Sequence, residues 1–340
     1  MEILTSLGWD AAWASALREH DAPDLAPARV SAEHRGSYQV FTAGGEVRAT
    51  ATGRLRHRAH HADGMPAVGD WVACSLHDGA ARIHRVLPRR TALVRKLAAE
   101  RIAAGQVVAA NLDTVFLTTS LNQDLNPRRI ERILALVWES GATPVILLTK
   151  SDLCDDAGPA MRAVEAVAWS VPVYAVSALT GAGCDVLHAH LGPGRTVALL
   201  GSSGVGKSTI ANRLLGEERL KVQTIRTDDD RGRHTTTARQ LFPLPGGGAL
   251  VDTPGLRGVG LWDSDDGLAR TFSDVEELAV QCRFRDCGHD KEPGCAIHAA
   301  VRAGDLPQER ADAWNKLRRE LAFLDRKRDQ QAYLDTKRRW

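Results

Sequence analysis

The stretch Gly201-Ser-Ser-Gly-Val-Gly-Lys207-Ser208 decides the fold of this chain. It follows an apolar run, Val197 to Leu200, and leads into a sequence with a helical pattern. A glycine-rich turn between a strand and a helix matches the phosphate-binding loop GxxxxGK(S/T), whose backbone N–H groups surround phosphate oxygens. A Gly/Ser turn without a ligand is the alternative. The predicted phosphate contacts are Gly201, Ser202, Ser203, Gly204, Val205, Gly206, Lys207, Ser208 and Thr209.

Two short motifs before this loop predict which base is bound. Thr149-Lys-Ser-Asp152 ends the apolar run Val145 to Leu148, and Ser177-Ala178 follows the apolar run Val173 to Val176. A carboxylate at a strand's carboxyl end can accept from N1–H and N2–H of guanine, whereas adenine offers neither donor in that geometry. A backbone N–H near Ala178 would contact the guanine O6. The predicted guanine contacts are Thr149, Lys150, Ser151, Asp152, Ser177 and Ala178.

A third motif predicts the magnesium and γ-phosphate contacts. Asp252-Thr-Pro-Gly255 follows the apolar run Ala249 to Val251 and matches DxxG, in which Asp holds Mg²⁺ through water and Gly contacts the γ-phosphate. The polar stretch 227–237 ends in three threonines, of which Thr236 or Thr237 could complete the magnesium shell, and the sequence does not choose between these two. A plain polar loop is the alternative for this stretch. The predicted magnesium residues are Ser208, Thr236, Thr237 and Asp252.

The order of these motifs indicates a circular permutation. Guanine-binding proteins ordinarily place the phosphate loop first and the base motifs last, whereas residues 149–152 and 177–178 precede the loop at 201 here. The DxxG segment therefore leads directly into the C-terminal part of the chain, so a change at the γ-phosphate could act on that part.

For hydrolysis, the predicted catalytic residues are Lys207 and His234. Phosphoryl transfer needs positioning and charge neutralisation, which Lys207 supplies. The residue after DxxG is Leu256 rather than a Gln that could orient water, and His234 is the nearest candidate for that role. A histidine that only packs or caps its loop is the alternative. We expect slow intrinsic turnover that a partner raises.

Four metal-ligating side chains crowd into 14 residues, in the pattern Cys282-x4-Cys287-x-His289-x5-Cys295. Three thiolates and one imidazole suit a closed tetrahedral zinc site of structural type. His298 is a spare candidate for the role of His289. Because few aliphatic residues lie between Arg283 and Glu292, we expect this segment to need one structural zinc ion to hold its shape.

Composition and texture divide the 340 residues into several parts. Hydrophobic residues make up 44%, the formal net charge is +2, and no apolar run approaches the ~18 to 20 residues of a membrane span. We expect a cytosolic, monomeric protein without a membrane partner. The sequence predicts an arm (1–34), a small β-barrel (35–100), an α/β domain with a mostly parallel sheet (101–267) and a helical domain (268–340).

Two basic surfaces are expected. Residues 82–101 hold seven Lys and Arg against one acid, and residues 310–340 hold ten against five. A small β-barrel with basic loops is a frequent platform for RNA. Solvated charge is the alternative for the barrel, and an amphipathic helix packed on its own domain is the alternative for the C-terminal run.

Together with Val68-Gly-Asp-Trp-Val72 and Gly232-Arg-His-Thr-Thr-Thr237, these motifs resemble the bacterial RsgA (YjeQ) family over about residues 35–330. The resemblance implies an N-terminal OB-fold, a circularly permuted GTPase domain and a C-terminal zinc-binding domain. It also implies late assembly of the small ribosomal subunit, with binding to the 30S particle and its 16S rRNA and stimulation of GTP hydrolysis to GDP. Thr149 stands where many relatives carry Asn.

Two other classes of function compete with this one. An ATP-dependent kinase or transport ATPase could use the same phosphate loop, but Asp152 and Ser177-Ala178 argue against it. A zinc-containing RNA-binding module with a vestigial nucleotide site is the other, and the complete set of Lys207, Ser208 and Asp252 argues against that.

Overall fold

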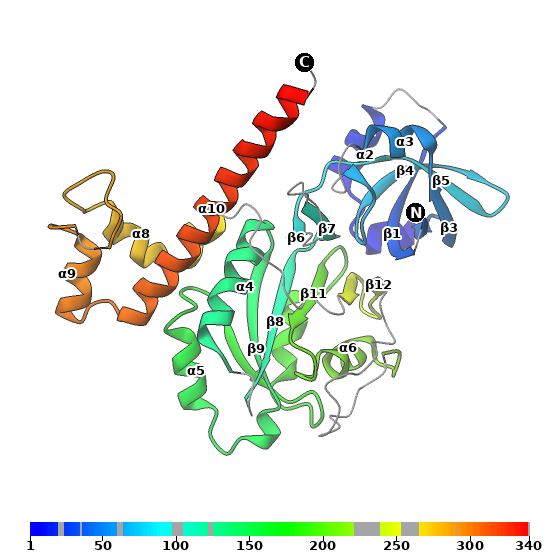
Figure 1. Cartoon of the computed structure of the whole chain (residues 1–340). Helices are drawn as coiled ribbons and strands as arrows, with labels where there is room; N and C mark the ends of the chain where they lie inside the picture. Colours follow the sequence, from blue (N-terminus) through cyan, green and yellow to red (C-terminus); the bar gives the residue numbers. More distant parts are fainter. Residues whose placement is uncertain are drawn as a thin grey trace, which may run out of the picture.

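The computed structural model of the chain describes residues 1–19, 24–34, 36–59, 64–96, 105–121, 125–220, 239–252, 265–290 and 292–338. Figure 1 shows three parts: a β-barrel near the N-terminus, a central sheet with helices on both faces, and a helical part that ends in a long helix. No helix within these ranges is both long and apolar enough to cross a bilayer.

The barrel has five strands: β1 (Ala26–His34), β2 (Ser37–Thr42), β3 (Gly45–Ala51), β4 (Trp71–His77) and β5 (Ala80–Val86). Their pairing order is β1-β2-β3-β5-β4, and β4 pairs again with β1, which closes the barrel. Strands β3 and β5 are parallel while the other barrel pairs are antiparallel. With α3 (Gly53–Arg58) between β3 and β4, this is the five-stranded Greek-key arrangement of an OB-fold.

The barrel begins earlier than the sequence analysis placed it. Residues 26–34, assigned there to the arm, form β1, whose inward residues Ala28 and Val30 are fully buried with Ile83 of β5. The short apolar and polar runs of this strand lack an obvious alternation, which is why composition alone does not separate it from the preceding Pro-containing stretch.

The arm itself consists of α1 (Glu2–Ser6) and α2 (Ala11–Arg18), and it packs where the barrel meets the central sheet. The wholly buried Arg29 of β1 donates to backbone carbonyls of Leu7, Gly69 and Asn111 and to the Thr196 hydroxyl. Burial lowers the pKa of Arg29 to about 10, so the guanidinium stays charged at neutral pH. One buried side chain therefore joins arm, barrel and central sheet.

A hairpin of β6 (Ala92–Lys96) and β7 (Gly105–Ala110) connects the barrel to the central sheet. That sheet contains β8 (Thr114–Ser120), β9 (Thr143–Thr149), β10 (Val173–Val176), β11 (Thr196–Gly201), β12 (Gln240–Pro243) and β13 (Ala249–Asp252). The order is β10-β9-β8-β11-β13-β12, with every pair parallel except β12 with β13. One further pair, Ala32 of β1 with Gln240 of β12, continues this sheet into the barrel.

Helices cover both faces of the central sheet (Figure 1). On one face, α4 (Pro127–Glu139) and α5 (Gly158–Glu165) pack on alternate residues of β8 and β9, such as Leu117 and Ile146. On the other face, α6 (Lys207–Leu215) packs on the intervening residues, such as Phe116 and Leu147. Strands buried on both faces explain the continuous apolar runs in the sequence. Short 3-10 segments, η2 (Ser151–Leu153) and η3 (Cys184–His190), follow β9 and β10.

The C-terminal part contains α7 (Asp265–Thr271), α8 (Ser273–Ala279), α9 (Ala296–Ala303) and α10 (Gln308–Arg338). Arg310 of α10 uses all five of its N–H donors: two to Asp274, one each to Glu131 of α4 and the carbonyls of Val167 and Thr271. This buried group therefore fastens the helical part to the central sheet. The C-terminal half of α10 extends beyond the body of the protein (Figure 1).

Candidate nucleotide site and metal centre

The phosphate loop is shaped by glycine and by the neighbouring strand. Gly201 ends β11 with φ of +157°, and a Cβ there would collide with the carbonyl and hydroxyl of Thr118 on β8. Only glycine lets the chain turn this close to β8. The Thr118 hydroxyl donates to the Leu200 carbonyl at 2.7 Å, which fixes the start of the turn.

Lys207, the first residue of α6, closes the loop. Its ammonium donates to the carbonyls of Gly201 (2.9 Å) and Ser202 (2.6 Å), so it lies inside the turn rather than in solvent. The same charge acts on Asp252 at the end of β13: burial raises the pKa of that carboxyl, and Lys207 lowers it in part. A cation and a half-buried carboxylate therefore face one another beside the loop, the arrangement that a phosphate and its metal require.

Strand register brings the separate motifs to one edge of the sheet. Thr149 pairs with Ser120 of β8 and with Val176 of β10, Gly201 pairs with Thr118, and Asp252 pairs with Leu199. All of these strands are parallel, so their carboxyl ends meet. The phosphate loop lies where the order of connection reverses between β8 and β11, the usual position of a ligand in an open α/β sheet.

Thr149 links the predicted base motif to the phosphate loop. Its buried hydroxyl lies 2.5 Å from the Val205 carbonyl in the loop and 3.2 Å from the Thr119 carbonyl of β8. The next residue, Lys150, has a left-handed backbone (φ +60°) and leads into η2, where Asp152 is exposed. The Thr149 hydroxyl therefore connects the end of β9 to the phosphate loop.

The second base motif is a tight turn after β10. Ser177 is fully buried; its N–H donates to the Ala182 carbonyl (2.8 Å), and its hydroxyl accepts from Thr180 N–H (3.1 Å). These bonds leave Ala178 and Leu179 at the outer side of the turn, where Leu179 is 78% exposed.

Four predicted site residues, His234, Thr236, Thr237 and Gly255, lie outside the described residues. Sequence reasoning missed Thr118, which shapes the loop through Leu200. The signal was present: an otherwise apolar strand ends in Thr118-Thr-Ser120, and polar side chains at the carboxyl end of a buried strand often serve a site.

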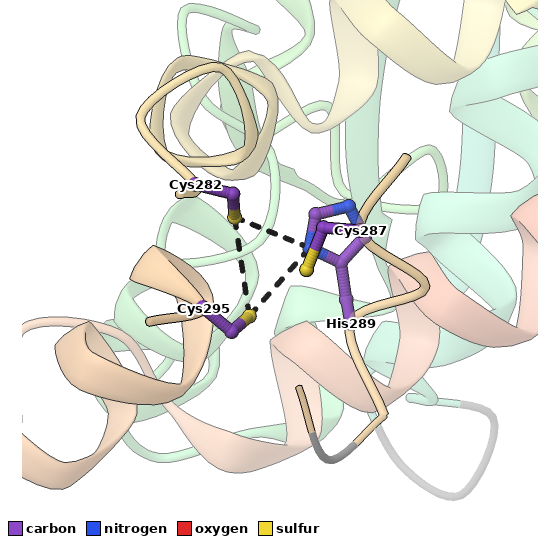
Figure 2. Close-up of side chains that lie close together, drawn as sticks. All are labelled: Cys282, Cys287, His289 and Cys295. Carbon is purple, nitrogen blue, oxygen red and sulfur yellow. Dashed lines mark hydrogen bonds between the residues drawn. The ribbon is translucent and has the colours of Figure 1, made fainter. Parts of the chain in front are cut away.

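The metal cluster assembles as its spacing predicts. One ligand atom from each of Cys282, Cys287, His289 and Cys295 lies within 4.8 Å of every other (Figure 2). Cys282 and Cys295 sulfurs are 4.0 Å apart, and each lies 3.5 to 3.6 Å from Nδ1 of His289. Tetrahedral bonds of ~2.3 Å to sulfur and ~2.1 Å to nitrogen require about 3.8 Å and 3.6 Å. These residues can hold one tetrahedral metal ion.

Neighbouring groups orient these ligands. The Ala296 N–H donates to the Cys282 sulfur, and Glu292 accepts from the N–H groups of Gly288 and Asp290, which shapes the loop around His289. The ring of Trp314 on α10 packs edge-on against His289. The spare candidate His298 instead lies 2.8 Å from the Asp290 carbonyl, so it is outside the cluster.

Comparisons with known proteins agree with this geometry. A family model described as RsgA GTPase matches residues 86–262. A protein of Streptomyces avermitilis named "Small ribosomal subunit biogenesis GTPase RsgA" is 46% identical, and the match covers 99% of this chain and 90% of that protein. The chain belongs to the RsgA GTPase family.

Solved structures confirm the fold. The crystal structure of YjeQ from Thermotoga maritima has a TM-score of 0.67 and 26% identity, covering 88% of this chain and 99% of that one. The structure of YloQ, described as a circularly permuted GTPase, has a TM-score of 0.61 and 23% identity, covering 89% and 97%. The permuted fold is therefore confirmed. As an RsgA-family GTPase, the chain hydrolyses GTP.

Proposed function

We propose that this GTPase acts in late maturation of the small ribosomal subunit, binding the 30S particle and its 16S rRNA as a monomer in the cytoplasm. Relatives named as small ribosomal subunit biogenesis GTPases support the choice of this subunit as the partner. A hollow of about 720 Å³ on the barrel is lined by small and polar residues, among them Arg48 and Arg82 against the one acid Asp78, and this basic excess suits a polyanion such as RNA.

We assign the triphosphate to the loop 201–209. Backbone N–H groups there, at the N-terminus of α6, favour phosphate charge. In this proposal the Lys207 ammonium leaves the Gly201 and Ser202 carbonyls when the nucleotide binds. It then donates to β- and γ-phosphate oxygens instead. Ser208 and Asp252, with Thr236 or Thr237, would hold Mg²⁺, which neutralises charge on the transferred phosphate. Gly255 would contact the γ-phosphate, and His234 would orient the attacking water.

We assign the guanine to residues 149–152 and 177–178. The observation that carries this assignment is the Thr149 hydroxyl, which bonds to the phosphate loop at Val205 and so holds base strand and loop at a fixed separation. Asp152, two residues beyond Lys150, would accept from guanine N1–H and N2–H. A backbone N–H at Ala178 would donate to O6.

We assign one structural zinc ion to the Cys₃His cluster. The agreement between the sulfur and nitrogen separations and those of tetrahedral Zn²⁺ supports this metal. Four protein ligands leave no open position, so the ion would hold the segment 282–295 together and take no part in hydrolysis.

Measuring phosphate release from GTP with purified 30S, 50S and 70S particles tests the ribosomal role. We expect the 30S particle alone to raise turnover, by at least about tenfold, a small share of what partners add to other GTPases. Unlabelled ATP should not compete with labelled GTP. Equal stimulation by 30S and 50S particles, or none by 30S, would contradict the proposal.

A further inference from the structure

The turn after β10 fixes two successive peptide groups by their carbonyls. The first is the Ser177–Ala178 peptide. Its carbonyl accepts from Gly181 N–H at 2.8 Å and from the Cys184 thiol at 3.4 Å, both inside the turn. Ser177 is fully buried, so this peptide has little freedom to rotate.

The second is the Ala178–Leu179 peptide, and it is held from another element. Arg213 of α6 donates from Nη1 to the Ala178 carbonyl at 3.4 Å. The guanidinium lies close to Gly181, whose φ is +90°: a Cβ at that residue would lie less than 3 Å from Arg213 Nη2 and Cζ. The hydrogen bond from Arg213 is long, but the contact with Gly181 also places the Arg213 side chain against the turn.

These contacts determine where the N–H groups point. In a planar trans peptide the N–H lies opposite the C=O. The Ser177 carbonyl is bound inside the turn and the Ala178 carbonyl by Arg213, so the N–H groups of Ala178 and Leu179 point away from those partners. Neither N–H donates to a group in the described part of the chain. Two adjacent N–H donors on neighbouring residues suit a single acceptor oxygen.

Arg213 also belongs to the helix that begins at the phosphate loop. Lys207 and Arg213 are six residues apart on α6, about 9 Å along its axis. Helix α6 therefore begins at the proposed phosphate site and, about two turns later, carries Arg213, which contacts the turn after β10. A positive charge behind the donors favours a carbonyl oxygen over an amino group at that position of a purine.

We propose that Arg213 is a positioning residue for guanine recognition: it holds the Ala178–Leu179 peptide so that the two outward N–H groups meet the purine 6-oxo group. This inference rests on the proposed guanine site. Arg213 does not touch the nucleotide and acts through the turn. It selects purines with a 6-oxo group, while Asp152 selects those with a 2-amino group.

The test compares three nucleotides by calorimetric titration. GDP carries both groups, 6-thio-GDP replaces the 6-oxo oxygen by sulfur, a weaker acceptor, and IDP lacks the 2-amino group. The parental protein should bind both analogues more weakly than GDP. Arg213→Ala should weaken GDP by about three- to tenfold, the range of one modest hydrogen bond. In this variant the ratio of GDP affinity to 6-thio-GDP affinity should be smaller than in the parental protein. The ratio of GDP affinity to IDP affinity should be unchanged.

Two variants control for charge and folding. Arg219→Ala removes an exposed arginine, paired with Glu217, just beyond the end of the same helix and should leave all three affinities unchanged. Arg213→Lys keeps the charge and one donor and should restore part of the GDP affinity. Arg213 is exposed, so its variants should unfold at the parental temperature.

The outcomes separate the two proposals. If Arg213→Ala changes all three affinities by one factor, or changes none, the positioning role is wrong while the guanine site stands. If the parental protein binds GDP, IDP and ADP equally, the guanine site itself is wrong.

Discussion

At the scale of single residues, we expect the hydroxyl of Thr149 to matter most for nucleotide binding. It is buried, and its bond to the Val205 carbonyl is the direct link between base motif and phosphate loop. Thr149→Val keeps the shape and removes this bond, so the loop loses a fixed point and a buried carbonyl loses its donor. We expect GDP to bind about five- to tenfold more weakly. Thr149→Ser keeps the hydroxyl and should bind GDP as the parental protein does; equal affinity of the Val variant would contradict the role.

A second buried residue, Glu131 of α4, should make stability depend on pH. Burial raises its pKa to about 7, and the charge of Arg310 opposes this in part. The folded state therefore holds this proton at pH values where the unfolded state, with a pKa near 4.5, has lost it. The stabilisation from this group is complete below pH ~4.5 and is lost as pH rises through ~7.

The glutamine in Glu131→Gln does not titrate. The free energy of unfolding of the variant, measured relative to the parental protein, should therefore increase by roughly 1 to 3 kcal/mol between pH 5 and pH 8. Denaturant unfolding at several pH values measures this. Glu165→Gln, an exposed position on α5, should follow the parental curve. If the free energy of unfolding of the Glu131 variant changes with pH as that of the parental protein does, Glu131 stays ionised beside Arg310 throughout this range.

At the scale of elements, the segment 282–295 should depend on its metal. It has little regular structure of its own, and the buried Cys287 and Cys295 form part of the core beneath Trp314. Cys287→Ser should lose the metal, unfold the segment locally because metal binding and folding are coupled there, and expose it to proteases. Elemental analysis should find one zinc per parental chain and none in the variant.

Cys154→Ser is the matched control for that experiment, because Cys154 is a half-buried cysteine outside the cluster. It should keep the zinc. Basal GTP hydrolysis should survive in both variants, since Lys207 and Asp252 belong to the central sheet. A Cys287 variant with full metal content would contradict the ligand set.

Sequence predicted the elements of the central sheet closely, because each strand is an apolar run followed by a motif with its own chemistry. Val173 to Val176 matches β10, and Val197 to Leu200 lies within β11 with one residue more at each end. The metal ligands followed from residue type and spacing. By contrast, β1 was assigned to the arm and β12 was not predicted at all. Strand β12 has only four residues, and β1 has no regular alternation of apolar and polar residues. Both are recognised as strands only by their pairing with other strands, such as that of Ala32 with Gln240.

The buried arginines were also beyond prediction. Arg29 and Arg310 resemble ordinary surface arginines in the sequence, and only the fold brings the carbonyls and carboxylates around them. Their partners lie up to 179 positions away along the chain. Such long-range contacts leave no local signal, whereas the phosphate loop is a local one.

At the scale of the whole molecule, the permutation changes the chain's connections and leaves the sheet intact. The strand with the phosphate loop, β11, lies between β8 and β13, with the base strands β9 and β10 beyond β8. The ends created by the permutation join other parts: the barrel enters at β8, and the chain after β13 leads to α7. Buried hydrogen bonds of Arg29 and Arg310 join those two parts to the central domain.

The central claim is that a base-recognising carboxylate from the first half of the sheet and a phosphate loop from the second half form one guanine-nucleotide site. Binding of GDP and xanthosine diphosphate to Asp152→Asn tests it most directly. We expect this variant to bind GDP at least about a hundredfold more weakly and to prefer xanthosine diphosphate, whose 2-oxo group accepts from the new amide. Unchanged GDP affinity in the variant would show that Asp152 does not recognise the base.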